Sequence, residues 1–201
     1  RLSPVSFMFA HAPMQMTTEI PDGIAMPDEV ETRLGTLRFF DGFPDADTTR
    51  ALYDNLDFQH GVQAFLGALR GASIAAVRRG FLSVGAEDNS FLLFSDLMDS
   101  ESLFLTANCD TVYFWGFVDL SDGPMVIDVP ALGAPSGVLG TIDDMWFNWV
   151  TDVGLPGPDR GAGGRYLIVG PGYEGALPDS GFHVSHSRTT RVTVIGRAFM
   201  I

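Results

Sequence analysis

Hydrophobic and polar residues alternate most clearly between residues 103 and 130, and this period of two predicts consecutive antiparallel strands. Within the strand expected at 111–119, Tyr113, Trp115 and Phe117 should share one face, and the even-numbered residues should occupy the other. A Ser-Asp-Gly-Pro sequence follows directly and is typical of a turn. The segment therefore predicts a sheet with two differently composed faces.

The same alternation continues toward the C-terminus, where the chain is predominantly of strand character. The strands it predicts, in addition to 111–119, lie at residues 91–94, 103–106, 124–129, 138–151, 165–169, 182–186 and 191–199. Seven or eight strands joined by turns favour a sandwich or jelly-roll-like body.

Helical spacing of apolar residues appears earlier in the chain, between residues 47 and 80. Asp57 and Ser73 have the chemistry of N-caps and Gly71 that of a stop, so we expect two or three short helices. A further short helix is predicted at 27–35, where Pro and acids come first and Arg and Gly come last.

Together these elements predict an α+β, β-rich fold in which an N-terminal arm and short helices pack against an antiparallel β-sandwich. We expect an extended, Pro- and Met-rich arm at 1–26, a mainly helical segment at 27–100 and the sandwich at 101–201. The strand at 191–201 ends without a polar tail, so we expect it to pair with a C-terminal domain or a second chain that completes the sheet. The arm is expected to pack on another domain or subunit of a homo-oligomer.

Composition narrows the class of partner. The formal net charge is −13, and the 12 basic residues are all Arg and form no concentrated patch, so nucleic acid is not an expected partner. No apolar run approaches the roughly 20 residues that cross a bilayer, so we expect a soluble protein without membrane insertion. The single Cys109 excludes an intramolecular disulfide, and bacterial cytoplasm, periplasm and secretion all stay open.

Acidic and aromatic residues around two of the strands form the strongest candidate site. Asp143 and Asp144 interrupt an apolar strand, and a buried acid needs a partner or a function. If the strand is continuous, Asp144, Trp146 and Asn148 share a face. We therefore predict Asp144 and Tyr113 as catalytic residues, and the substrate-binding residues as Trp115, Trp146, Asn148 and Asp110. The alternative is a structural, hydrogen-bonded Asp144 at a turn.

The sequence gives weaker signals for cofactor, metal and phosphate binding. No cofactor and no metal ligand set is predicted, although the Asp cluster could hold a divalent cation. The Gly-rich stretch at 154–165 is followed by a strand, whereas a phosphate-binding loop requires a helix there. It predicts a connector with Asp159 and Arg160 at an exposed tip, compatible with a lid or an oligomer contact.

Several segments give the chain its family resemblance. They are VETRLGTLRFFDGFP at 30–44, LYDNLDFQHGVQAFL at 52–66, DLMDSESLFLTANCDTVY at 96–113, DLSDGPMVIDVP, the stretch from IDDMWF to GYEG, and SRTTRVTVIGRAF. Across about 27–199 the chain resembles domain of unknown function 1254, with Cys109 as a local departure from the pattern. The resemblance implies a β-rich, capsid-like oligomeric architecture and a second domain that follows in the same polypeptide.

Two functions of different class follow from these observations. The chain is either the N-terminal half of a hydrolase-like enzyme acting on a small organic substrate, or a non-catalytic β-sandwich assembly module of a trimeric or larger, capsid-like oligomer. The enzyme requires a pocket with convergent polar groups, whereas the assembly module requires a large apolar interface.

Overall fold

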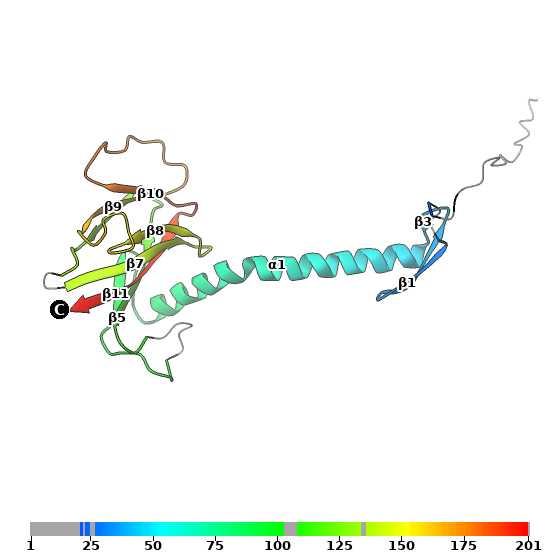
Figure 1. Cartoon of the computed structure of the whole chain (residues 1–201), viewed down its shortest axis with the longest axis horizontal. Coiled ribbons are helices and arrows are strands. Elements are labelled where there is room, and N and C mark those ends of the chain that lie inside the picture. The colour runs from blue at the N-terminus through cyan, green and yellow to red at the C-terminus, as the bar shows by residue number, and fades with distance from the viewer. Residues whose placement is uncertain (1–20, 22, 25–26, 103–107, 134–135, 201) are drawn as a thin grey trace, which may run out of the picture. The chain divides into compact units, whose positions relative to one another are not determined.

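The computed structural model describes residues 21, 23–24, 27–102, 108–133 and 136–200. The chain divides into two compact units, Arg1–Ala64 and Phe65–Ile201. The arm expected at 1–26, apart from three of its residues, and the strand expected at 103–106 lie outside the described residues. Figure 1 gives the course of the chain.

In the first unit, three strands form a small antiparallel sheet of order β1-β2-β3. Their bounds are β1 Glu29–Thr32, β2 Gly35–Phe40 and β3 Phe43–Pro44. The short helix predicted at 27–35 is therefore wrong: Val30 pairs with Leu37, and the Thr32 hydroxyl bonds to the amide of Leu34 and the carbonyl of the following residue to close the turn. A nine-residue helix is marginal in water, whereas the hairpin pairs its β-branched and aromatic residues.

A tight turn joins the second and third strands. Asp41 and Gly42 both have positive φ, 48° and 81°, as a two-residue hairpin turn requires. Helix α1 Ala46–Ser83 follows, and its N-cap is Asp45, whose carboxylate accepts a hydrogen bond from the Thr48 amide at 2.7 Å.

Helix α1 is continuous, so the prediction of two or three short helices is wrong. Ser73, expected as a cap, donates its hydroxyl to the Leu69 carbonyl at 2.8 Å and stays inside the helix. The helix ends at Ser83, and Gly85, at φ 91°, lets the amides beyond the end bond to carbonyls of the last turn. No helical segment in the described part of the chain combines the length and apolar character of a membrane span.

The second unit contains the remaining strands in two sheets. Their bounds are β4 Ser90–Phe94, β5 Val112–Asp119, β6 Met125–Val129, β7 Ser136–Asp144, β8 Trp149–Val153, β9 Gly164–Val169, β10 His183–His186 and β11 Arg191–Met200. One sheet has the order β4-β5-β11-β7-β8 and is antiparallel throughout; the other has the order β10-β9-β6, in which only β10 and β9 are parallel.

Strand β11 is the central strand of the larger sheet. It pairs with β5 along one edge, from Arg191 to Ala198, and with β7 along the other, from Val192 to Met200 (Figure 1). The prediction that this strand pairs with strands outside the chain is therefore wrong. Both of its edges are filled by the chain's own backbone.

The two faces of the larger sheet pack against different elements. One face meets the smaller sheet in an apolar core built from Val118, Ile142, Ile168, Val192 and Val194 among others. This cluster confirms the predicted β-rich α+β class, in which two sheets enclose a core.

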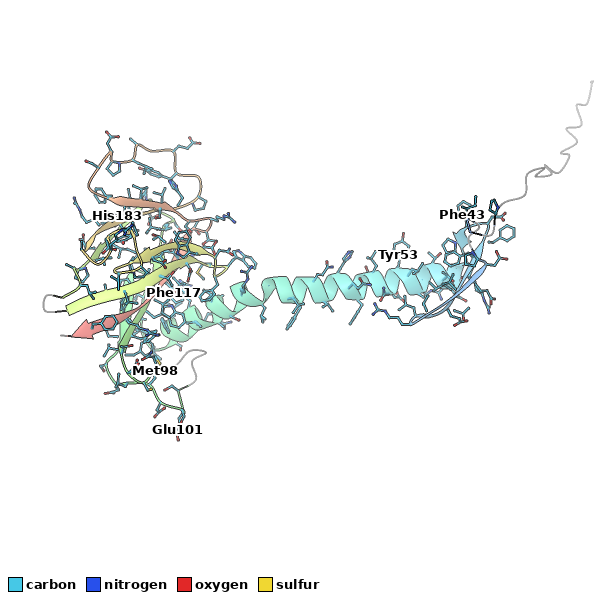
Figure 2. The ribbon with its side chains drawn as sticks, viewed as in Figure 1. Phe43, Tyr53, Met98, Glu101, Phe117 and His183 are labelled. Carbon is cyan, nitrogen blue, oxygen red and sulfur yellow. The ribbon has the colours of Figure 1, made fainter. Side chains whose placement is uncertain are left out.

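The opposite face receives the C-terminal part of α1. There Phe81 packs edge-on against Trp115 and Phe117, at ring-centroid distances of 5.5 and 5.7 Å, and Ile74 completes the cluster (Figure 2 labels Phe117). Trp115 and Phe117 therefore do share a face, as the alternation predicted.

The Gly-rich segment differs from its prediction at one residue. Asp159 is buried rather than exposed at a tip, and its carboxylate accepts hydrogen bonds from the Tyr166 hydroxyl and the Gly163 amide. Burial and this partner raise the pKa of the Tyr166 phenol. Asp159 thus ties the connector to strand β9.

Candidate functional site

The candidate site depends on where the chain turns between β7 and β8. The sequence predicts one continuous strand over 138–151, but β7 ends at Asp144 and β8 begins at Trp149. Phe147 has a φ of 58°, and its amide bonds to the Asp144 carbonyl at 2.9 Å. The expectation that Asp144, Trp146 and Asn148 share a strand face is therefore wrong, because the backbone leaves the sheet between them.

Asp144 holds this turn together. Its side chain is 1% exposed, and one oxygen accepts the backbone amides of Trp146 and Asn148 at 2.8 and 2.9 Å. The Asn148 side-chain amide bonds to both carboxylate oxygens, at 3.1 and 3.0 Å. These contacts match the structural alternative for Asp144, an acid whose oxygens are taken by the turn.

Asp143 has a different environment, although it is the adjacent residue. It is 7% exposed, and the one hydrogen bond to its carboxylate in the described part of the chain comes from the Thr141 hydroxyl at 3.4 Å. Burial raises the pKa of Asp143, and the negative charges of Asp152 and Asp144 raise it further. A register shift between Ile142 and Asp143 marks a bulge, a feature that re-aims side chains near sites.

Tyr113 lies opposite Arg197 on the neighbouring strands β5 and β11. The Arg197 Nε donates to the Tyr113 hydroxyl at 3.0 Å, and the guanidinium carbon lies 5.4 Å from the ring centroid. Arg197 is half-buried and forms no ion pair with any acid that the structure describes. Its remaining N–H groups are therefore available to a ligand.

Tyr113 and Arg197 line one cavity of about 370 Å³, which we call the polar pocket. The lining residues are Tyr113, Leu139, Gly140, Thr141, Phe147, Asp152, Pro156, Ile195, Gly196 and Arg197. Thr141 and Asp152 are direct cross-strand partners. A side chain at Gly140 would collide with the Ile195 carbonyl, so glycine is required there.

The polar pocket contains both charge types in one small volume. Arg197 and Tyr113 provide hydrogen-bond donors, and Asp152 provides acceptors, with Asp143 bonded to the adjacent Thr141. Donors of this kind bind a carboxylate or a carbonyl oxygen. A carboxyl group with a raised pKa is suited to proton transfer near neutral pH.

Of the six predicted site residues, the structure brings only Tyr113 into the polar pocket. Trp146 and Asn148 belong to the turn of Asp144, and Trp115 lies in the core, where its indole N–H donates to the Thr193 hydroxyl at 2.5 Å. Asp110 is exposed in the loop before β5. The roles assigned to these residues stay predictions.

Sequence reasoning missed Arg197. A signal was present, because Arg197 is a charged residue within the otherwise apolar run that forms the end of β11. Among the described residues, no group of three or more His, Cys, Asp or Glu side chains is placed to hold a metal ion.

Comparison with known proteins gives a family match and similar solved structures. Residues 89–200, more than half of the chain, match the model of the family described as protein of unknown function (DUF1254). The crystal structure of the VPA0106 protein from Vibrio parahaemolyticus is similar at 18% sequence identity and a TM-score of 0.49. The likeness covers 67% of this chain and 32% of that one, so this chain spans about a third of that protein. No curated protein matches the chain.

Proposed function

The chain belongs to the DUF1254 family, and we propose that its second unit carries the substrate pocket of a hydrolase-like enzyme that acts on a small organic ester. The polar pocket is the proposed site. Its volume lies within the range of small-molecule sites, about 300 to 1,000 Å³.

The observation that carries this proposal is the half-buried Arg197 without an acidic partner. Several described arginines form no ion pair with a described acid, but the others are exposed, and Arg197 is the one among them that is half-buried. Partial burial of an unpaired guanidinium costs free energy unless a ligand oxygen compensates it. The Tyr113 hydroxyl accepts from Arg197 and keeps its own proton to donate to the same oxygen.

In the proposed reaction, Arg197 and Tyr113 bind the ester carbonyl oxygen and stabilise the negative charge that develops on it. A carboxylate of the Asp143–Asp152 pair removes a proton from water as the water oxygen attacks the carbonyl carbon. The bond to the leaving alkoxide then breaks, and that alkoxide takes up the proton. Asp152 lines the polar pocket and is the first candidate for this step; Asp143, whose pKa is raised by burial and neighbouring charge, lies beside Thr141 of the same lining.

The test is hydrolysis of a panel of short-chain p-nitrophenyl esters by the chain. Arg197→Gln should lower kcat/KM by about 100-fold, as the loss of an oxyanion donor does, and Tyr113→Phe by about tenfold. Tyr173→Phe is the matched control, because Tyr173 lies outside the polar pocket. Equal activity of Arg197→Gln and the unmodified chain on a hydrolysed ester would reject the proposal, as would failure to hydrolyse any ester in the panel.

A second function, the assembly module, is supported by exposed aromatic residues near the same hairpin. Trp149 is 67% exposed and Phe147 48% exposed, and β8, which begins at Trp149, is an edge strand of the larger sheet. In this proposal the edge of β8 joins a second copy in a trimeric or larger, capsid-like oligomer.

Light scattering tests the assembly proposal. Trp149→Lys should lower the mass of the oligomer, because it places a charge in the proposed apolar contact. Leu97→Lys, at another exposed apolar residue, is the control and should leave the mass unchanged. An unmodified chain that is monomeric at all concentrations would reject this function.

A further inference from the structure

A second pocket in the same unit is lined by arginine side chains and has no part in the proposed reaction. We call it the arginine pocket; it has a volume of about 380 Å³ and is lined by Ala75, Arg78, Arg79, Met145, Thr189, Thr190 and Arg191. Residues of α1, of the β7–β8 turn and of the start of β11 therefore meet around one cavity. The polar pocket and the arginine pocket share no lining residue.

Two of the arginines are held in place by half-buried acids. Arg78 forms a bidentate pair with Asp88, through Nε at 2.8 Å and Nη2 at 2.5 Å. Arg191 bonds to Asp88 at 3.1 Å and to Asp119 at 2.5 Å. The Arg78 guanidinium lowers the pKa of Asp88, so this carboxylate is charged at neutral pH and keeps both arginines in position.

These ion pairs leave some of the guanidinium N–H donors without a partner among the described residues. Each guanidinium has five N–H groups, and the contacts above use Nε and Nη2 of both Arg78 and Arg191. The Nη1 groups of both have no partner among the described residues. The Arg79 side chain forms no ion pair or hydrogen bond with any residue that the structure describes.

Charge in the arginine pocket is correspondingly unbalanced. Three arginines line it, whereas two acids, Asp88 and Asp119, pair with them. The excess is positive in a chain whose net charge is −13. Fixed guanidinium groups with free N–H donors are the usual means by which proteins bind tetrahedral oxyanions.

We propose that the arginine pocket binds the phosphate group of a small organic phosphate. Arg79 supplies the uncompensated charge, Arg78 and Arg191 supply fixed donors, and the Thr190 hydroxyl supplies another. A phosphate has more acceptor oxygens than a carboxylate and matches several donors at once. The apolar Ala75 and Met145 are the side chains that the organic part would contact.

Isothermal titration calorimetry on the full chain at constant ionic strength tests this site. Glycerol 3-phosphate should bind with 1:1 stoichiometry, inorganic phosphate more weakly, and acetate at least about tenfold more weakly than glycerol 3-phosphate. Tighter binding of inorganic phosphate than of glycerol 3-phosphate would overturn the organic part of the proposal. Acetate binding equal to or tighter than that of both phosphates, or no saturable phosphate binding, would overturn it altogether.

Arg79→Gln is the decisive variant, because Arg79 has no bond in the fold that its loss would break. It should weaken glycerol 3-phosphate binding about tenfold or more and leave the thermal midpoint without ligand unchanged. Arg188→Gln is the matched control, since Arg188 is exposed nearby in the chain but does not line the arginine pocket. Equal weakening by both variants would indicate general charge attraction and reject the site.

Discussion

Asp143 and Asp144 are joined by one peptide bond, yet they occupy opposite kinds of environment. Asp144 accepts four hydrogen bonds within the β7–β8 turn, whereas Asp143 receives one long bond and faces the negative charge of Asp152. Both are nearly inaccessible to solvent. Burial alone therefore does not distinguish a structural acid from a reactive one, and the number of donors around each carboxylate does.

The largest expected effect on stability comes from replacing Asp144, and it tests the contrast between the two acids directly. Asp144→Asn removes the charge and places an amide against the Asn148 amide, so the free energy of unfolding should fall by about 1 to 3 kcal/mol. Urea unfolding measures this change. Asp122→Asn, at an exposed turn acid, should have little effect.

An unchanged stability of Asp144→Asn together with loss of ester hydrolysis would reverse the assignment. Asp144 would then be the catalytic acid that the sequence suggested, and the turn would be held by its backbone contacts.

A smaller effect on stability is expected where helix α1 packs against the same turn. Gly71 of α1 lies under the Trp146 ring, and an added Cβ would come within 2.8 Å of it. Gly71→Ala should therefore lower stability by about 1 kcal/mol or more, because overpacking exceeds the helix gain. Gly67→Ala, where an added Cβ would meet no other part of the protein within 4 Å, should raise stability by up to about 1 kcal/mol.

Thermal or urea unfolding of these two alanine variants separates packing from helix propensity. If both variants are stabilised equally, the contact between α1 and the turn does not constrain Trp146.

The smallest effect concerns Asp143 and depends on pH. Its pKa is raised in the folded chain, so the folded state binds this proton more tightly than the unfolded state. The associated stability is complete below the unfolded pKa of 3.8 and is lost as pH rises through the folded pKa. Asp143→Asn should therefore gain stability relative to the unmodified chain as pH rises above 3.8.

Urea unfolding of both proteins at several pH values checks this difference. The pKa of Asp88 is lowered, so its contribution to the free energy of unfolding has the opposite pH dependence and is lost as pH falls. This contribution is the same in both proteins and cancels in the difference between them. A difference that is independent of pH would show that Asp143 does not titrate differently in the folded state.

The amino-acid sequence alone determined the β-rich class, the family and most strand positions, because alternation at a period of two is a local property. The two faces of β5 were predicted on the same basis. The site was predicted only in part: Tyr113 was identified, and Arg197 was not. Their pairing depends on the register of β5 with β11, strands more than 70 residues apart in the chain.

Only the tertiary structure decided which strands are neighbours and where a strand ends. Residues 138–151 alternate well enough for a single strand, but the donors that gather around Asp144 favour a turn. Helix α1 stays continuous through Gly71 and Ser73, although both have the local chemistry of a boundary. In each case the local preferences are small, about 1 kcal/mol per residue, and hydrogen bonds and packing between distant segments outweigh them.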